Sequence, residues 1–166
     1  MTTPLLPAAI VRVATHEIGI EEVDGTNCGP RVDDYKACTN LPPHESWPWC
    51  AAFICFCVKA AMEATGIKET AGFKRPKTAG AWDLENWSRR QDNTTSTKKP
   101  HGGDIQAGDI VVFTFSHVGI AISAPKNGFV ETIEGNSDLQ GSREGGAVGR
   151  HTRKLSQIRS RIRFTV

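Results

Sequence analysis

Several features of membrane-bound and repeat proteins are missing from this 166-residue sequence. No apolar run approaches the roughly 20 residues that span a bilayer, so we expect a soluble protein without membrane insertion. The N-terminal segment has no basic leader followed by a long apolar core, so we expect synthesis in the cytoplasm without a signal peptide. Because no internal repeat or second domain is visible, residues 1–166 are expected to form one domain.

The cysteines do not follow a pattern that supports disulfides or a metal site. Their number, five, is odd, and Cys55 and Cys57 lie too close along one predicted helix to form an easy bridge. No Cys-x2-Cys spacing is present, and we expect reduced thiols and no cofactor. A non-enzymatic module that binds metal or polymer through Cys28, Cys38, Cys55, Cys57 and His44 is the alternative of another class.

Acidic residues are missing from the last seventeen positions, which carry the basic residues Arg150, Arg153, Lys154, Arg159, Arg161 and Arg163. Such a segment could hold an anionic polymer. The other interpretation is an edge strand with solvated arginines at alternate positions, and it is favoured because no aromatic stacking platform accompanies the charge. We expect no nucleic-acid partner.

Helical signals dominate the first half of the chain. Apolar spacing and boundary residues predict helices over residues 6–18, 31–38, 47–66 and 78–90. Ser46 is the expected cap of the long apolar helix, with Pro48 in its first turn. Thr78 is the expected cap of the last helix, which presents Trp82 and Trp87.

From Asp109 onward, short runs of apolar residues are typical of strands, which are expected over residues 109–115, 117–123, 129–133, 148–152 and 160–166. Their short spacings favour antiparallel hairpins over parallel crossovers. Residues 91–108 and 135–149 are rich in polar residues or glycine and are expected to be loops. The order predicts an α+β domain, with N-terminal helices packed on a C-terminal antiparallel β-sheet.

One cysteine stands at the entrance of the long apolar helix, in WPWCAAFICFCVKAA. A helix N-terminus carries unpaired N–H groups and partial positive charge, so Cys50 is easier to ionise there than in a free chain. Its backbone N–H could also stabilise an oxyanion formed when the sulfur attacks a carbonyl. Cys50 is therefore a candidate nucleophile, whereas Cys55 and Cys57 are interpreted as core residues.

A thiol nucleophile needs a base, and the base needs a partner that orients it. His117 stands at the start of a predicted strand, which is a rigid mount. Glu134 and Asn136 lie two residues apart at the end of the next strand, where an antiparallel pairing would bring them beside His117. Each residue alone has a structural explanation, but their ordered combination favours Cys–His thiol catalysis.

Five segments resemble the CHAP domains, cysteine- and histidine-dependent amidohydrolases and peptidases of bacterial cell walls. They cover nearly the whole chain and read HEIGIEEVDGTNCGP, PWCAAFICFCVKAA, GDIVVFTFSHVGIAIS, VETIEGNSD and GSREGGAVGRHTR. The sequence looks most like compact single-domain phage and prophage endolysins. This resemblance implies a papain-like cysteine peptidase fold, with Cys50 as nucleophile, His117 as general base, Glu134 as orienting carboxylate and Asn136 as a further polar member.

The resemblance also implies a peptidoglycan hydrolase that acts on the bacterial cell wall after release, as a monomer. The enzyme would be an N-acetylmuramoyl-L-alanine amidase or a peptidoglycan endopeptidase. A secreted antibacterial amidase effector and a thiol acyltransferase are alternatives on the same fold. Trp47 and Trp49 are expected beside the substrate, while Trp82 and Trp87 are expected in the core.

Some CHAP domains bind calcium through an acidic loop near the nucleophile. The corresponding segment here, LPPHESWPW, has Glu45 as its only carboxylate, so we expect no metal there. Asp24, Asp33 and Asp34 form a weaker candidate cluster, for which a solvated loop and a helix start are the favoured explanation.

Overall fold

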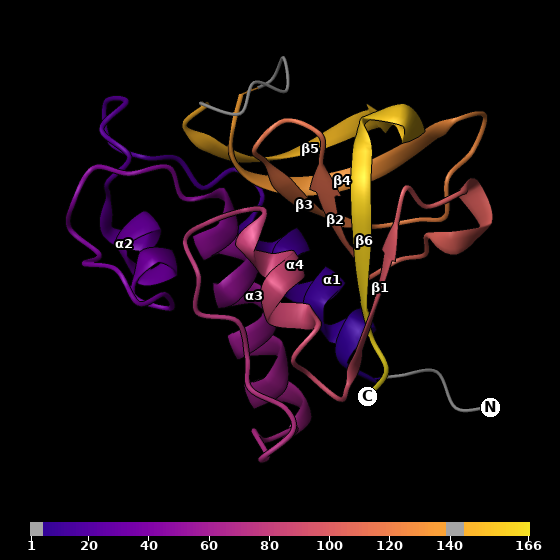
Figure 1. Ribbon diagram of the computed structural model, residues 1–166. Coiled ribbons are helices and arrows are strands. Elements are labelled where there is room, and N and C mark those ends of the chain that lie inside the picture. The colour runs from indigo at the N-terminus through magenta and orange to yellow at the C-terminus, as the bar shows by residue number, and fades with distance from the viewer. Residues whose placement is uncertain (1–4, 139–144) are drawn as a thin grey trace.

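A computed structural model describes residues 5–138 and 145–166 and has the expected α+β, papain-like fold. Its helices are α1 (Leu5–Glu17), α2 (Pro30–Lys36), α3 (Cys50–Thr65) and α4 (Asp83–Ser88). Figure 1 shows α1 and α3 together against the sheet, with α2 beyond α3 and away from the strands. The helical layer therefore comes from the first half of the chain, as predicted.

One six-stranded sheet forms the other layer. Its strands are β1 (Thr94–Lys98), β2 (Ile110–Phe113), β3 (Val118–Ala121), β4 (Phe129–Ser137), β5 (Ala147–Lys154) and β6 (Ile158–Phe164). They lie in the order β1-β6-β2-β3-β4-β5, and every neighbouring pair is antiparallel. The predicted preference for hairpins over parallel crossovers is confirmed.

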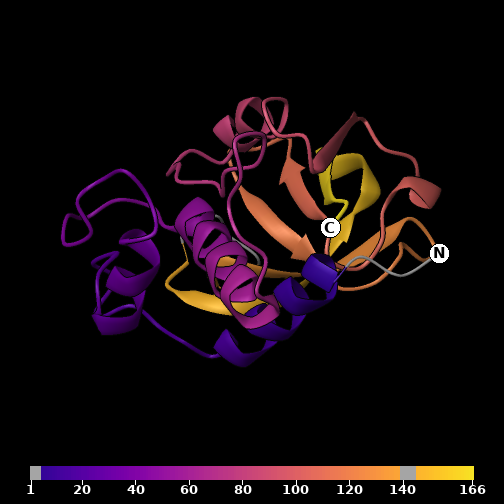
Figure 2. The ribbon, with the colours of Figure 1, turned by 90° about the horizontal axis from the view of Figure 1, so that it is seen from below.

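Two apolar clusters cover the two faces of this sheet. Along β2, Ile110 and Val112 belong to the cluster under the helices, whereas Val111 and Phe113 belong to a smaller cluster, as alternation along a strand requires. Figure 2 shows α1 and α3 lying side by side across the sheet. At Gly135 a Cβ would come within 2.7 Å of the Phe53 side chain, so this glycine lets β4 approach α3 closely.

Two helix boundaries differ from the prediction. The long helix begins at Cys50, with Trp49 as its N-cap and no capping side chain, so Ser46 is not its cap. A residue before proline avoids helical backbone angles, which disfavours a helix start at Trp47. The last helix has only six residues and has Trp82 as its N-cap. Thr78, the expected cap, accepts a local hydrogen bond from the Gly80 N–H at 3.1 Å instead.

The strand prediction fails in two segments that were expected to be loops. Residues 94–98 form edge strand β1, whose threonine-rich sequence has no apolar alternation to reveal it. Strand β4 continues through Ser137, past the glycine expected to end it. Residues 139–144 of the other expected loop lie outside the described part of the chain.

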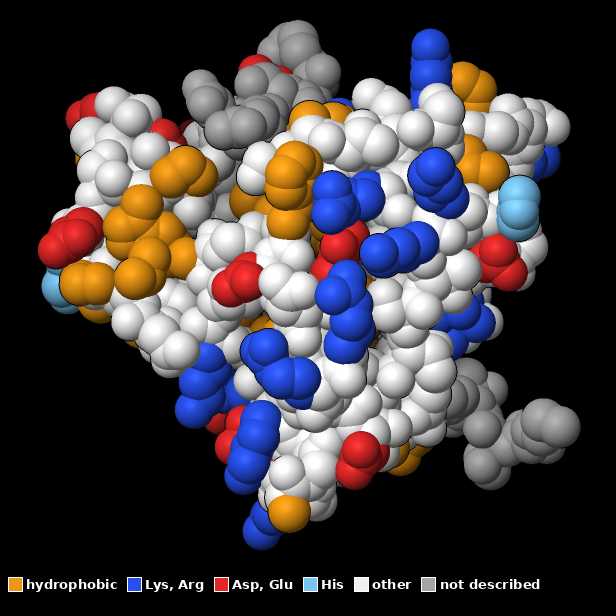
Figure 3. Space-filling view, viewed as in Figure 1, with side chains coloured by type: hydrophobic (Ala, Val, Ile, Leu, Met, Phe, Trp, Pro, Cys, Tyr) orange, Lys and Arg blue, Asp and Glu red, His pale blue; other side chains and the backbone are white. Residues whose placement is uncertain are grey.

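The basic C-terminal segment supplies parts of two strands. One of them, β5, is an edge of the sheet with Arg150 and Lys154 exposed, as the edge-strand interpretation expects, whereas β6 lies between β1 and β2. Four of its arginines have internal partners: Arg153, Arg159, Arg161 and Arg163. Figure 3 shows basic side chains spread over the face that carries β1 and β6, with acidic side chains between them. Both interpretations of this segment therefore overestimated its free positive charge. No helix in the described residues is long and apolar enough to cross a membrane.

Candidate active site

Cys50 is the first residue of α3, and this end of the helix packs against β4, where a Cβ at Gly135 would meet Phe53 and Trp49. The Phe53 N–H bonds to the Trp49 carbonyl at 2.9 Å, so the earlier amides of the first turn have no carbonyl partner within the helix. Cys50 is 5 % exposed. The helix thus presents a thiol together with N–H groups that favour negative charge.

His117 is held at the end of the turn between β2 and β3. Its carbonyl accepts the Phe113 N–H at 3.0 Å, and its imidazole is fully buried. The ring lies nearly parallel to the rings of Phe113 and Phe115, with centroids 5.7 and 5.9 Å away. The start of the strand therefore fixes the His117 backbone, as predicted, and packing against the two phenylalanine rings fixes the imidazole.

Glu134 accepts four hydrogen bonds and therefore fills every acceptor position of its carboxylate. His117 Nε2 lies 2.8 Å from Oε2, and the Thr132 hydroxyl donates to Oε1 at 2.6 Å. Arg153 donates through Nε to Oε1 at 2.8 Å and through Nη2 to Oε2. Burial raises the pKa of Glu134, but Arg153 and His117 outweigh it and lower this pKa to about 2.

The thiol and the carboxylate act on His117 together. Burial lowers the pKa of His117, but the neighbouring Cys50 and the hydrogen-bonded carboxylate of Glu134 raise it to about 9. Because Glu134 engages Nε2, the nitrogen available to Cys50 is Nδ1, which is buried and forms no aligned hydrogen bond with a described residue. The raised pKa favours the imidazolium form of His117 near neutral pH.

Gly119 leaves the space that the Glu134 side chain occupies. These residues lie on adjacent strands, and a Cβ at Gly119 would come within 2.7 Å of Glu134 Cγ. Real Cβ contacts are never this short, so any larger residue would displace the carboxylate. The position of the Glu134 carboxylate therefore depends on a glycine at position 119, the glycine in HVGIAIS.

Asn136 is buried in a β-bulge near the end of β4, where its backbone adopts a left-handed conformation with φ of 55°. Ser137 fixes the bulge by bonding to the Glu134 carbonyl at 3.2 Å and to His151 Nε2 at 2.8 Å. Asn136 also lines an open groove of about 800 Å³. The bulge therefore places Asn136 at the groove rather than in a loop.

The groove runs past the N-terminal end of α3. Its described lining consists of Glu21, Glu22, Gly25, Asn27, Pro48, Asn136, Ser137, Asp138, Gly146 and Ala147. Three of these residues are acidic, and none is basic. The segment EEVDGTN, for which the sequence suggested no role, thus forms one wall of the groove.

Trp49 does not lie at a substrate surface, contrary to the prediction. It is fully buried against Tyr35, and its indole N–H donates to Glu22 Oε2 at 2.9 Å. Trp47 is half-buried and donates to the Pro42 carbonyl at 2.9 Å. Its predicted contact with substrate stays a prediction.

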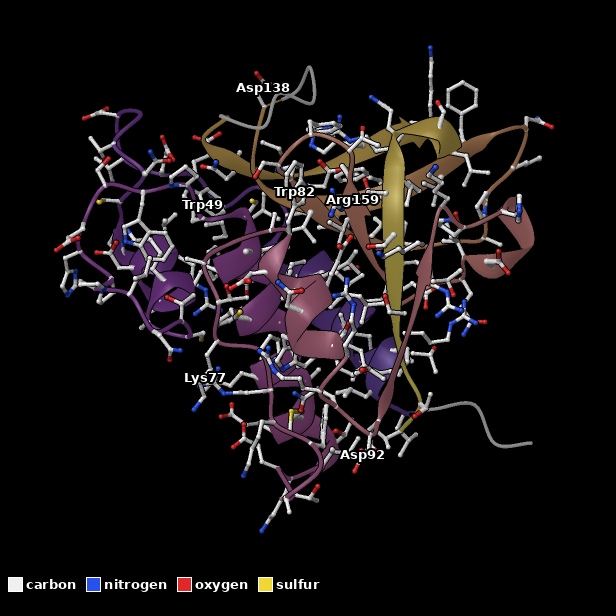
Figure 4. All side chains as sticks on the ribbon, viewed as in Figure 1. Trp49, Lys77, Trp82, Asp92, Asp138 and Arg159 are labelled. Carbon is white, nitrogen blue, oxygen red and sulfur yellow. The ribbon has the colours of Figure 1, made fainter. Side chains whose placement is uncertain are left out.

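The assignment of Trp82 to the core is also wrong, since 41 % of this residue is exposed, whereas Trp87 is buried as expected. The indole N–H of Trp82 donates to the Phe113 carbonyl at 3.1 Å, beside the turn that carries His117. Figure 4 shows Trp49, Trp82 and Asp138 around the upper end of α3. Trp82 is therefore the tryptophan that lies exposed near the candidate site.

The remaining cysteines have different surroundings. Cys55 and Cys57 are fully buried in α3, as predicted, and burial raises the pKa of Cys55 to about 12 and that of Cys57 well above its usual range.

In the described parts of the chain, no three His, Cys, Asp or Glu side chains converge in a group that could hold a metal. Asp33 instead contacts His44 at 2.9 Å.

Sequence reasoning missed Thr132, Arg153 and the steric role of Gly119. Thr132 stands two residues before Glu134, and alternation along a strand could have placed both on one face. Arg153 is one of six basic residues near the C-terminus, and nothing in its local sequence distinguishes it from its neighbours. Its partner is set by the pairing of β4 with β5, in which Val130 lies opposite Arg153.

Comparison with models of protein families identifies the family of this chain. Residues 42–136, more than half of the chain, match the model of the CHAP domain family. The match includes Cys50, His117, Glu134 and Asn136 and ends before β5. No curated protein matches the chain.

Proposed function

Because the chain belongs to the CHAP domain family and is thus a cysteine- and histidine-dependent amidohydrolase or peptidase, we propose that it cleaves an amide bond in the peptide part of bacterial peptidoglycan. The observation that carries the proposal is the contact chain Cys50–His117–Glu134 next to an open groove. It supplies a nucleophile, a proton carrier and an orienting carboxylate in one place.

In the proposed first step, the Cys50 thiolate attacks the carbonyl carbon of the scissile amide, and a C–S bond forms. Backbone N–H groups in the first turn of α3 are suited to stabilise the oxyanion. The C–N bond then breaks as His117 transfers its proton from Nδ1 to the leaving amine. The products of this half-reaction are a free amine and a thioester on Cys50.

In the second step, a water molecule attacks the thioester while neutral His117 takes its proton at Nδ1. The C–S bond breaks, the carboxylic acid product leaves, and the Cys50 thiolate and the His117 imidazolium are regenerated. Glu134 supports both steps by holding Nε2 at 2.8 Å. It cannot act on substrate itself, because its four acceptor positions are occupied.

We place the substrate in the groove beside Pro48 and Asn136, with Trp82 next to the turn that carries His117. An open groove suits a polymer, because a strand of peptidoglycan must enter from the side. The scissile bond is either the bond between muramic acid and L-alanine or a bond within the stem or cross-bridge. An endolysin-like role, in which the protein acts on the wall after its release, is part of the proposal.

The test is digestion of purified peptidoglycan by the unmodified protein, Cys50→Ala and Cys38→Ala. Cys38 is a matched control, since it is buried and its thiol donates to the Asp34 carbonyl in α2, away from His117 in the turn before β3. We expect soluble fragments from the unmodified protein and from Cys38→Ala, and none from Cys50→Ala. Undiminished release by Cys50→Ala would refute the proposal, and fragment masses would identify the bond.

A further inference from the structure

Arg153 is a buried cation that contacts the candidate site by hydrogen bonding to Glu134. It lies on β5, outside the residues that match the CHAP family model, and its side chain is 9 % exposed. Both of its forked N–H groups point to the two oxygens of one carboxylate. This is the bidentate geometry that arginine provides and lysine does not.

Stability alone does not explain a buried arginine at this position. Desolvation offsets much of the attraction in a buried ion pair, and apolar residues of similar volume often serve a core equally well. The surroundings of Arg153 show a more specific arrangement. Its guanidinium lies 5.1 Å from the Phe113 ring and 5.4 Å from the Phe115 ring, the same two rings that stack on His117.

The hydrogen bonds of Glu134 determine which nitrogen of His117 holds the proton. Arg153 and Thr132 donate three of the four bonds that this carboxylate accepts. The fourth position can then be filled only by a donor, so His117 Nε2 carries a proton and Nδ1 is left to exchange one. This matters most in the thioester stage of the proposed reaction, where a neutral imidazole must accept a proton from water.

We infer that Arg153 is a positioning residue, which acts through Glu134 to keep the neutral His117 imidazole protonated at Nε2. Its effect on turnover rests on the proposed function, but its effect on His117 does not. A lysine at this position keeps the charge and loses the fork, so it would hold only one carboxylate oxygen at a time.

Kinetics on a peptidoglycan substrate supply the first test. We expect Arg153→Gln to lower kcat/KM about 100-fold, as for other groups that orient a reacting side chain, and Arg153→Lys to recover part of the loss. Arg31→Gln is the matched control, because Arg31 makes the same forked contact with Glu17 and that carboxylate contacts no histidine. Equal kcat/KM for Arg153→Gln and the unmodified protein would overturn the inference.

A double-variant comparison separates positioning from direct contact with substrate. If Arg153 acts through Glu134, adding Arg153→Gln to Glu134→Gln should change kcat/KM little. A full additional loss of about 100-fold would overturn the inference by showing an independent role. Thermal unfolding of each variant identifies any loss that is only structural, and Arg153→Lys supplies the same comparisons if Arg153→Gln does not fold.

The nitrogen NMR spectrum of His117 tests the inference without any substrate. Above the pH at which the ring becomes neutral, we expect the Nε2–H tautomer in the unmodified protein and a mixture of the Nε2–H and Nδ1–H tautomers in Arg153→Gln. An unchanged spectrum in Arg153→Gln would overturn the inference. If the unmodified protein cleaves no peptidoglycan, the proposed function fails, while this spectrum still decides the role of Arg153.

Discussion

Two buried carboxylates, Glu17 and Glu134, have almost the same donors and different surroundings. Each accepts a forked contact from one arginine and a hydrogen bond of 2.6 Å from a hydroxyl, which belongs to Tyr35 or Thr132. The arginine of Glu17 is 41 % exposed at its side chain, whereas that of Glu134 is 9 % exposed. Only Glu134 also contacts a histidine.

The comparison separates a carboxylate that joins helices from one that orients a reacting group. Glu17 ties α1 to α2 through Arg31 and Tyr35. Glu134 ties β4 to β5 in the same way and additionally fixes His117. Changes at Glu17 should therefore alter stability, and changes at Glu134 should alter turnover.

The largest effect is expected for Glu134→Gln. An amide can donate to Nε2, which favours the wrong tautomer, so kcat/KM should fall on the order of 10³- to 10⁴-fold. Glu17→Gln, its counterpart, should leave kcat/KM of the folded protein unchanged. Steady-state kinetics measure kcat/KM for both variants. An equal loss of kcat/KM in Glu17→Gln and Glu134→Gln would contradict the distinction between the two carboxylates.

Gly119→Ala should have the next largest effect, because its Cβ would come within 2.7 Å of Glu134 Cγ. A shift of the carboxylate by about 1 Å can reduce kcat/KM about 100-fold. Gly103→Ala is the control, since no atom lies within 4 Å of a Cβ there and its backbone is not left-handed. Similar kcat/KM values for the two variants would contradict the steric role of Gly119.

The dependence of kcat/KM on pH sharpens the comparison further. Because the pKa of His117 is raised to about 9, its imidazolium persists up to that pH, and activity should fall as pH rises through about 9. Glu134→Gln removes a negative charge from His117, so residual activity should fall at lower pH. Glu17→Gln should keep the original profile, and a shifted profile for this variant would contradict the account.

The smallest effect is a change in stability without a change in activity. Glu17→Gln removes the carboxylate of the forked Arg31 contact, leaves Arg31 its longer contact with Asp34 at 3.3 Å, and weakens the Tyr35 contact. The free energy of unfolding should therefore fall by about 1–3 kcal/mol. Urea denaturation measures this value. No loss of stability would show that the Glu17 cluster is not the helix connection described above.

Local sequence patterns predicted the features that depend on neighbouring residues. The apolar face of α3, its glycine end at Gly66 and the short strand runs follow from helical or alternating periodicity. The pairing of His117 with Glu134 followed from two antiparallel strands and the chemistry that a thiol nucleophile needs. The fold class and the grouping of these candidates were therefore predictable.

Other features depend on contacts between distant segments, which a single sequence does not reveal. Trp49 is buried against Tyr35 and donates its indole N–H to Glu22, and the exposed Trp82 donates its own to the Phe113 carbonyl; each partner is distant in the sequence. Arg153 reaches Glu134 only because β5 pairs with β4. Strand β1 was missed because its polar residues lie at an edge, where little burial selects for apolar alternation.

The central claim, that Cys50 and His117 form a reactive pair, is tested most directly by the rate at which iodoacetamide modifies each cysteine near neutral pH. Peptide mass spectrometry would follow Cys50 and the buried Cys57 in the unmodified protein and in His117→Ala. The account predicts fast modification of Cys50, slow modification of Cys57, and a large loss of the Cys50 rate in His117→Ala. Equal rates for the two thiols, or a Cys50 rate that does not depend on His117, would contradict it.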